Sequence, residues 1–271
     1  MLEFSVLASG SSGNSTYIRT ETTQILLDAG ISKKQIELRL HDVCQASLAD
    51  LSAVLITHEH IDHVRGLKQV LKRTSASLYM TEGTWSQIQE QVSDKNQTVA
   101  TPECEFVSEG RPLIIGDIRV TPFRVSHDAE EPVAFRFDTE KESLAVVTDL
   151  GYVSDVIKSV LTGCKTFVFE ANHDVEMLRA GRYPWSVKRR ILGDKGHLSN
   201  TDAAVALVDL LGTEEVDVYL AHLSEENNQP DLADLTVKSV LTEVKAYYGE
   251  QVSLHRTSRH VATPLHRIVE F

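Results

Sequence analysis

Short apolar segments rich in β-branched residues recur along the 271-residue chain, and each is bounded by Gly, Asp, Ser or Pro. Such segments between turn-forming residues are typical of β-strands. On this pattern, strands are predicted at 4–8, 16–19, 24–27, 53–57, 118–120, 133–137, 144–148, 167–169 and 216–220. Apolar residues spaced i, i+3 and i+4 indicate amphipathic helices instead. These helices are predicted at 33–43, 64–72, 203–211 and 231–248.

The two kinds of element are unevenly distributed along the chain. The first half has hairpin-like strands, whereas the second half alternates strands with helices. No linker, low-complexity tract or internal repeat separates the halves, so we expect one α/β domain over 1–271 with packed sheets. Ser199, followed by Asp202, is typical of a helix N-terminus, with Asp in place of the usual Glu of a capping box.

Histidines and carboxylates follow several of the predicted strands directly. Strand 53–57 continues into the hexapeptide 58–63 (HEHIDH), and later strands end at His127, Asp149 and His222. The carboxyl ends of strands are where open α/β sheets place their ligand sites. Rigid strands that deliver imidazole and carboxylate groups are what a metal centre needs. The sequence therefore predicts metal chemistry.

The number of candidate ligands predicts two divalent ions in each chain. The predicted metal ligands are His58, His60, Asp62, His63, His127, Asp149 and His222. The first two histidines of the hexapeptide point to the same side of an extended chain, and His127 can complete a set of three nitrogens. The other two ligands of the hexapeptide would face a second ion with His222, and Asp149 has two oxygens with which to bridge both ions. These ligands suit Zn, and also Mn or Fe, and two such ions activate water for attack at phosphorus or carbon.

This set of residues resembles the signature of the metallo-β-lactamase superfamily. The resemblance covers nearly the whole chain and implies an αββα sandwich, in which two packed mixed β-sheets are flanked by helices and carry a dinuclear site at their rim. It also implies that Asp28, at the end of strand 24–27, supports the metal loop without binding metal. Lactamases of the zinc-cysteine type would have Cys at the position of Asp149, and the flavodiiron pattern would replace a histidine of the hexapeptide by Glu. This chain has neither change, so it resembles neither of these two subfamilies.

The segment 196–200 (GHLSN) resembles the His-containing segment of tRNA 3′-processing enzymes and related phosphodiesterases. That resemblance implies that His197 contacts the scissile phosphate or protonates the leaving oxygen. It also implies that Glu170, at the end of strand 167–169, orients this histidine. Together with Asp62, which we count both as a ligand and as a catalytic residue, these are the predicted catalytic residues.

Three further segments resemble the bacterial YycJ/WalJ/VicX group, namely 10–15 (GSSGNS), 170–174 (EANHD) and 222–228 (HLSEENN). Members of that group resemble DNA exonucleases of 5′→3′ polarity. A Gly/Ser loop can present backbone N–H groups to a phosphate. Substrate contacts are therefore predicted for Ser11, Ser12 and Asn14 of this loop, and also for Ser199 of the segment 196–200.

Charge is uneven along this acidic chain. The 27 Lys and Arg against 39 Asp and Glu give a net charge of −12, which argues against a protein that binds nucleic acid through a uniformly basic surface. The segment 179–195, however, has six basic residues and one acidic residue, and it contains Trp185. Cations beside an aromatic side chain suit single-stranded nucleic acid. Arg189 and Arg190 are therefore predicted to contact DNA, either single-stranded or at duplex ends.

Composition and cysteine usage narrow the class of protein further. The chain is 42% hydrophobic and 24% charged, as in ordinary globular proteins, and we find no secretory signal and no apolar run near the ~20 residues of a membrane span. Three distant cysteines without CxxC spacing fit the reducing cytoplasm.

We therefore expect a cytoplasmic metal-dependent hydrolase that cleaves phosphodiester bonds, with a 5′→3′ DNA exonuclease favoured. RNA, a small cyclic or nucleotide diester, or a thioester as in glyoxalase-II-like enzymes are the alternative substrates. A metal-binding regulatory partner without catalysis is the alternative from another class.

Overall fold

A computed structural model describes residues 1–92, 104–212, 214–244 and 251–268. The chain divides into two compact units. The first unit comprises Met1–Arg124, Ala129–Glu142 and Ser258–Val269, and the second contains Val125–Asp128 and Ser143–Thr257. The expectation of one domain over 1–271 stays a prediction, and each unit is described here by itself.

The first unit is built on a seven-stranded mixed sheet. Its order is β14 (His266–Arg267), β1 (Glu3–Ala8), β2 (Ser15–Arg19), β3 (Gln24–Leu27), β4 (Ala53–Leu55), β5 (Ser77–Met80) and β6 (Cys104–Phe106). Neighbours are antiparallel from β14 to β3 and parallel from β3 to β6. The central strands are buried on both faces, which explains why they are continuous apolar segments in the sequence rather than alternating ones.

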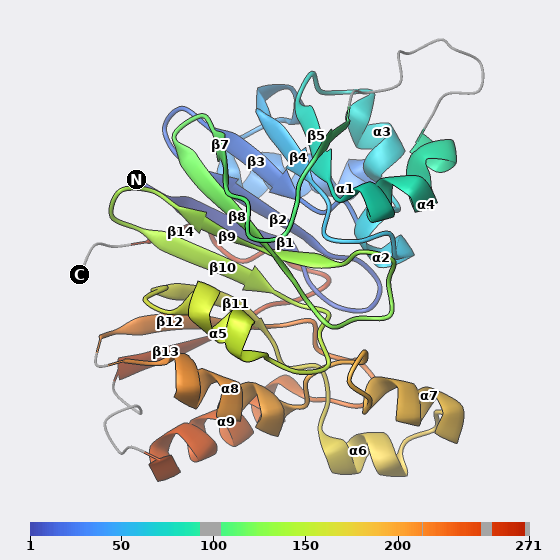
Figure 1. Cartoon of the computed structure of the whole chain (residues 1–271), viewed down its shortest axis with the longest axis vertical. Helices are drawn as coiled ribbons and strands as arrows, with labels where there is room; N and C mark the ends of the chain where they lie inside the picture. The colour runs from blue at the N-terminus through green and yellow to red at the C-terminus, as the bar shows by residue number, and fades with distance from the viewer. Residues whose placement is uncertain (93–103, 213, 245–250, 269–271) are drawn as a thin grey trace. The chain divides into compact units, whose positions relative to one another are not determined.

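Helices of the first unit cover this sheet and follow its strands (Figure 1). They are α1 (Lys33–Arg39), the π-helical turn η1 (Leu40–Cys44), η2 (Leu48–Asp50), α2 (Ile61–Val64), α3 (Leu67–Leu71) and α4 (Glu82–Val92). The helix predicted at 64–72 is interrupted at Gly66, whose N–H donates to Ala29 O at 2.7 Å. A Cβ at Gly66 would lie 2.2 Å from Ile31 O, so the backbone there is packed against the chain after β3.

A second group of strands in the first unit is the antiparallel set β7 (Leu113–Ile115), β8 (Ile118–Arg124) and β9 (Val133–Asp138). The turn between β7 and β8 is fastened to the β2–β3 turn, because Asp117 accepts hydrogen bonds of 2.6 Å from the hydroxyls of Thr20 and Thr23. The sequence predicts a strand from residue 118, with 118–120 as its most apolar part and 125 as its end before His127, and the structure has it from Ile118 through Pro122 to Arg124.

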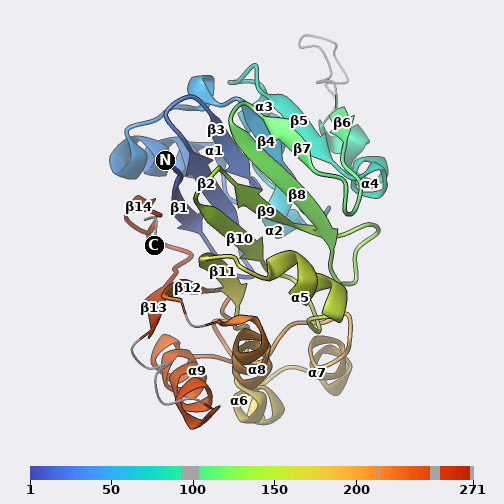
Figure 2. The same cartoon turned by 60° about the vertical axis from the view of Figure 1, so that its left-hand side comes forward.

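The second unit is a parallel sheet with helices between its strands. Its strands, in sheet order, are β10 (Ser143–Val147), β11 (Thr166–Glu170), β12 (Val216–Ala221) and β13 (Val252–Arg256). Its helices are α5 (Asp155–Leu161), α6 (Val175–Ala180), α7 (Trp185–Ile191), α8 (Asn200–Leu210) and α9 (Pro230–Val244). Figures 1 and 2 show α8 and α9 side by side next to this sheet.

Two predicted helices of the second unit are found with shifted ends. The helix predicted at 203–211 is α8, and Ser199 is its N-cap, with its hydroxyl accepting the N–H of Asp202 at 3.1 Å. The helix predicted at 231–248 is α9, and its last four predicted positions lie outside the described residues. In the described part of the chain, no helix combines the length and apolarity needed to cross a membrane.

Candidate metal centre

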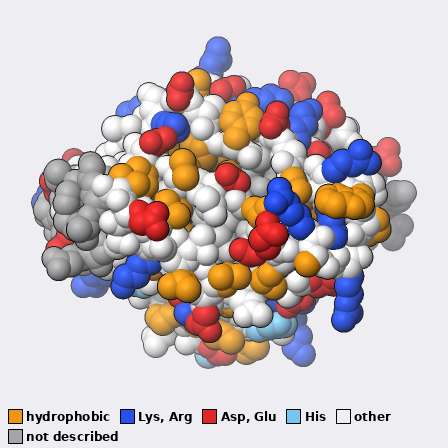
Figure 3. Space-filling model, turned by 90° about the horizontal axis from the view of Figure 1, so that it is seen from below, with side chains coloured by type: hydrophobic (Ala, Val, Ile, Leu, Met, Phe, Trp, Pro, Cys, Tyr) orange, Lys and Arg blue, Asp and Glu red, His pale blue; other side chains and the backbone are white. Residues whose placement is uncertain are grey.

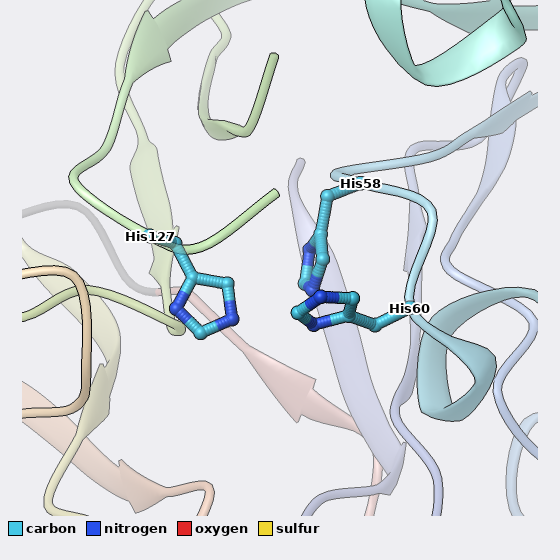
Figure 4. Close-up of side chains that lie close together, drawn as sticks. All are labelled: His58, His60 and His127. Carbon is cyan, nitrogen blue, oxygen red and sulfur yellow. The ribbon is translucent and has the colours of Figure 1, made fainter. Parts of the chain in front are cut away.

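The hexapeptide 58–63 follows β4 in the first unit, and its last three residues are the first three of α2. His58 and His60 place their imidazole centroids 4.7 Å apart, and those of His58 and His63 lie 4.1 Å apart. Figure 4 shows the rings of His58 and His60 next to each other, drawn together with His127 of the second unit. His58 and His63 are 1% and 0% exposed, so their ring nitrogens are directed into the protein rather than to solvent.

Asp28 holds this turn from the end of β3. Its carboxylate accepts the N–H of Thr57 at 2.9 Å and the Nδ1–H of His63 at 2.8 Å. The hydroxyl of Thr57 donates to the same carboxylate and lies 3.0 Å from Nδ1 of His58. Both histidines are therefore oriented through Nδ1, so that their Nε2 atoms lie on the opposite side of each ring.

The Gly/Ser loop packs against the same turn. Asn14 N donates to Asp62 O at 2.7 Å, and the Asn14 side-chain nitrogen lies 3.1 Å from His63 Nε2 and 3.3 Å from an Asp62 carboxylate oxygen. Asn14 is buried, Ser12 is half-buried and Ser11 is exposed. Asn14 thus supports the ligand loop, and its predicted contact with substrate, like those of Ser11 and Ser12, stays a prediction.

Replacing Gly30 with Ala is expected to lower stability and displace the ligand loop. An added Cβ would lie 1.6 Å from Asp62 O and 2.5 Å from Asn14 N, both backbone atoms. Overpacking of this kind destabilises a protein by about 1–3 kcal/mol or more, which thermal unfolding would detect as a lower Tm. Gly212→Ala is the control, because a Cβ there meets open space. Equal Tm values for the two variants would show that the loop does not need this close approach.

A second cluster lies at the carboxyl ends of the parallel strands in the second unit. One ligand atom from each of Asp149, Glu170, His197 and His222 lies within 4.8 Å of those of the others. Asp149 follows β10, and its Oδ1 is 3.4 Å from His222 Nε2 and 3.8 Å from His127 Nε2. All of these side chains except that of His197 are nearly or fully buried.

Glu170, which is fully buried at the end of β11, links two of these histidines. Its Oε1 accepts Nδ1–H of His197 at 2.8 Å and Nδ1–H of His222 at 3.0 Å, while Oε2 accepts the N–H groups of Leu150 and Leu198. Burial would raise the pKa of this carboxyl, but the two histidines outweigh it and lower the pKa to about 2. For His197 the directions are reversed: burial by itself would lower the pKa of the imidazole, but the charge and hydrogen bond of Glu170 outweigh burial and raise the pKa.

His127 is held by the loop that carries His197. Its Nδ1 lies 3.2 Å from Gly196 O, and burial lowers its pKa against the opposing charge of Asp149. The next residue, Asp128, forms an ion pair with Arg190 of α7. Arg189 and Arg190 are both exposed, but only Arg190 is paired within the described part of the protein, and the predicted DNA contacts of both stay predictions.

Left-handed backbone marks the strand ends that deliver these groups. Among the described non-glycine residues with positive φ are Asp28 (59°), Asp149 (62°) and His222 (57°). Such conformations are unfavourable for residues with a Cβ, and they persist where the surrounding structure requires them, often at functional sites. The turn after each strand thus redirects the side chain that follows it.

The asparagines that fix the loops of the second unit were not among the predicted site residues. Asn172 donates to His222 O at 2.8 Å, and Asn228 donates to the carbonyls of Ala171 and Asn172. Asn172 is in the segment 170–174 and Asn228 in the segment 222–228. These segments were interpreted only through their resemblance to the YycJ/WalJ/VicX group, and no role was predicted for the two asparagines. Ser199 is 1% exposed and its hydroxyl caps α8, and its predicted contact with substrate stays a prediction.

The residues fit divalent ions by their chemistry. Histidines that bind metal through one nitrogen usually have the other held by a carboxylate, a carbonyl or a similar group. The Nδ1 contacts of this kind are His58 to Thr57, His63 to Asp28, His127 to Gly196 and His222 to Glu170. Buried imidazoles and carboxylates oriented in this way are suitable ligands for Zn, Mn or Fe.

Comparison with known proteins identifies the class. The β-lactamase superfamily domain matches residues 23–223, and the chain belongs to this superfamily. The metallo-β-lactamase-fold protein YhfI of Bacillus subtilis aligns over 97% of this chain and 98% of its own, with a TM-score of 0.71 and 13% identity. This likeness confirms the predicted αββα fold, with two mixed sheets flanked by helices.

Within the superfamily, the chain belongs to the YycJ/WalJ group that the sequence segments indicated. It is 44% identical over 264 residues to the exodeoxyribonuclease YycJ of Bacillus anthracis, covering 97% of this chain and 98% of the relative. It is 40% identical over 266 residues to the exodeoxyribonuclease WalJ of Streptococcus pneumoniae, covering 98% of each chain.

Proposed function

We propose that this chain is a cytoplasmic, metal-dependent exodeoxyribonuclease of 5′→3′ polarity. The names of its relatives support DNA as the substrate. The observation that carries the proposal is the Glu170 carboxylate, which holds through Nδ1 both a metal-ligand candidate, His222, and an imidazole suited to proton transfer, His197. The three cysteines of the chain are free thiols, in keeping with a reducing compartment.

We propose as metal ligands the residues that the sequence predicts. His58, His60 and His127 would hold one ion, Asp62, His63 and His222 the other, and Asp149 would contact both. When bound, two divalent ions polarise the phosphate and lower the pKa of a water molecule that attacks it. Their identity as Zn, Mn or Fe is part of the proposal, as these ligand types suit all three.

The chain's own residues supply proton transfer and substrate position. As water attacks phosphorus, the P–O ester bond breaks and the leaving oxygen takes a proton from Nε2 of His197, while the proton released by the attacking water goes to solvent, from which His197 is protonated again. Glu170 keeps Nδ1 of that imidazole engaged at 2.8 Å, so that Nε2 is directed to the other side of the ring. Ser11, Ser12 and Asn14 would contact phosphate through the Gly/Ser loop, and Arg189 would contact the strand outside the site.

A comparison of substrates tests this proposal. The metal-reconstituted protein is incubated with DNA, with RNA of the same sequence, with a small chromogenic phosphodiester and with a glutathione thioester. We expect DNA to be degraded fastest, with mononucleotides or very short products released. Thioester hydrolysis with the DNA left intact would contradict the proposal and favour the glyoxalase-II-like alternative.

Replacing Asp28 with Asn is expected to weaken metal binding by about 10–100-fold, the usual effect of losing a partner of a ligating histidine. Asp28 accepts from Thr57 N on one oxygen and from His63 Nδ1 on the other. Asn has a single accepting oxygen, so one of these two groups loses its partner and the ligand loop is held less firmly. Competition with a chromophoric chelator measures the affinity. Asp117→Asn is the matched control, since Asp117 accepts from Thr20 and Thr23 and makes no hydrogen bond with a histidine among the described residues. An unchanged affinity in Asp28→Asn would show that metal binding does not depend on the hydrogen bond from Asp28 to His63.

A further inference from the structure

The side chain of Trp185, at the start of α7, is 62% exposed. It is one of two tryptophans in the chain, and the other, Trp85, is half-buried against the core of the first unit. A single exposed hydrophobic residue needs no explanation by itself. The surroundings of Trp185, all within the second unit, supply further observations.

Lys188, one turn after Trp185 in α7, connects α7 to α6. It is only 6% exposed, and its Nζ donates to the carbonyls of Arg179 (2.6 Å) and Gly181 (2.7 Å) at the carboxyl end of α6. The same Nζ lies 5.4 Å from the centroid of the Trp185 ring, within range of a cation–π contact. Lys188 therefore supports the indole from the protein side and is not available to a phosphate.

The remaining cations of this segment fall into two kinds. Arg190 is paired with Asp128, and Arg179 with Glu176. Arg182, Arg189 and Lys195 are exposed, and within the described ranges none of the three makes an ion pair. Figure 3 shows the surface seen from below, on which basic and hydrophobic side chains lie next to each other on the right, the side on which Figure 1 places α7.

We infer that Trp185, Arg182 and Arg189 form a binding surface for single-stranded DNA, an inference that rests on the proposed function and deepens it. An unpaired base stacks on the indole, and the guanidinium groups contact the phosphates beside it. Trp185 and Arg189 are four residues apart on α7 and so share a side of that helix. A base within a duplex already stacks on its neighbours, so this surface selects unpaired nucleotides.

The backbone connects this surface closely to His197. After α7 ends, His197 N donates to Ile191 O at 3.0 Å, and Gly196 N donates to Gly193 O at 2.8 Å. A Cβ at Gly196 would lie 2.1 Å from Ile191 O, so this turn is tightly packed. Trp185 and the loop that carries the proposed proton donor are therefore at the two ends of α7, about 9 Å apart along the helix axis.

Tryptophan fluorescence tests the inference directly. In a Trp85→Phe background, Trp185 is the sole tryptophan of the full, metal-loaded chain. The probe is a phosphorothioate oligothymidylate, which keeps its charges and resists cleavage. We expect strong quenching that weakens with salt, and much weaker quenching by a duplex of equal length.

Variants separate stacking from charge. Trp185→Ala, in the otherwise natural chain, is expected to weaken oligothymidylate binding about tenfold or more in a fluorescence-anisotropy titration, and Trp185→Phe to restore part of the loss. Arg189→Ala should lower the salt dependence by about one phosphate contact. Leu235→Ala and Lys238→Ala are the controls, because both residues are exposed on α9, and neither change should alter binding.

Absent quenching, equal quenching by duplex, or unchanged affinity of Trp185→Ala would each overturn the inference. Self-association that depends on Trp185, without quenching by the oligonucleotide, would also overturn it and assign the surface to a second copy of the chain. Degradation of ordinary DNA without quenching would leave the proposed function intact. Quenching without any degradation would support this surface and refute the proposed function.

Discussion

Replacing Asp149 with Asn is expected to abolish DNA degradation, with turnover at least about a thousandfold lower, because several kcal/mol of transition-state stabilisation depend on the ions. Asp149 is 3% exposed, and its Oδ1 is 3.4 Å from His222 Nε2 and 3.8 Å from His127 Nε2. Asn keeps the size of the side chain but removes the negative charge and one oxygen. The variant should therefore hold less metal while it keeps its fold.

Three measurements test this variant: atomic absorption for its metal content, circular dichroism for its fold, and steady-state kinetics for its turnover. Asp217→Asn is the matched control, because Asp217 is also paired with a histidine, accepting from His255 Nε2 at 2.6 Å near the start of β12. That pair lies at the opposite end of the strand from His222, so the control should keep both metal and activity. Normal turnover in Asp149→Asn would refute the proposed mechanism.

Replacing Glu170 with Gln is expected to lower kcat by about 10–100-fold, the usual effect of losing a partner of a ligating histidine. The fully buried carboxylate accepts four hydrogen bonds, two from histidine Nδ1 atoms and two from backbone N–H groups. Gln has one oxygen and an NH₂ group that cannot accept. One histidine or the backbone must therefore lose its partner, which also destabilises the fold by about 1–3 kcal/mol.

The loss of stability must be separated from the loss of activity. Asp202→Asn is a suitable comparison, because Asp202 accepts from Ser199 at the start of α8 and touches neither His197 nor His222 in the described structure. It should destabilise the second unit without a comparable fall in kcat. A Glu170→Gln enzyme with unchanged kcat and metal content would show that neither histidine depends on this carboxylate.

Much of the fold was predictable because the buried strands are continuous apolar segments. Strands β1 to β4 and β8 to β12 correspond to predicted segments. Strand β13 was missed, since Val252–Arg256 includes a His and an Arg and is only partly buried at a sheet edge. Helices α6 and α7 were missed because they are short and largely exposed, with one buried residue each, and therefore have little apolar periodicity.

The candidate ligands were predictable because each follows a strand, but their orientation was not. Left-handed backbone at Asp28, Asp149 and His222 has no signature in residues that are not glycine. The link from Glu170 to His222 was not predicted either, since these residues are 52 positions apart. Local sequence indicates which residue ends a strand, but it does not indicate which loops of neighbouring strands meet.

End-labelled DNA tests the central claim most directly. The metal-reconstituted protein is incubated with DNA labelled only at its 5′ end, beside the Asp149→Asn variant, and the products are separated on a denaturing gel. The account predicts rapid release of labelled mononucleotide or very short product by the natural chain and intact DNA with the variant. Intact DNA with both proteins in the presence of Mn and Zn would contradict the account, as would equal degradation by both.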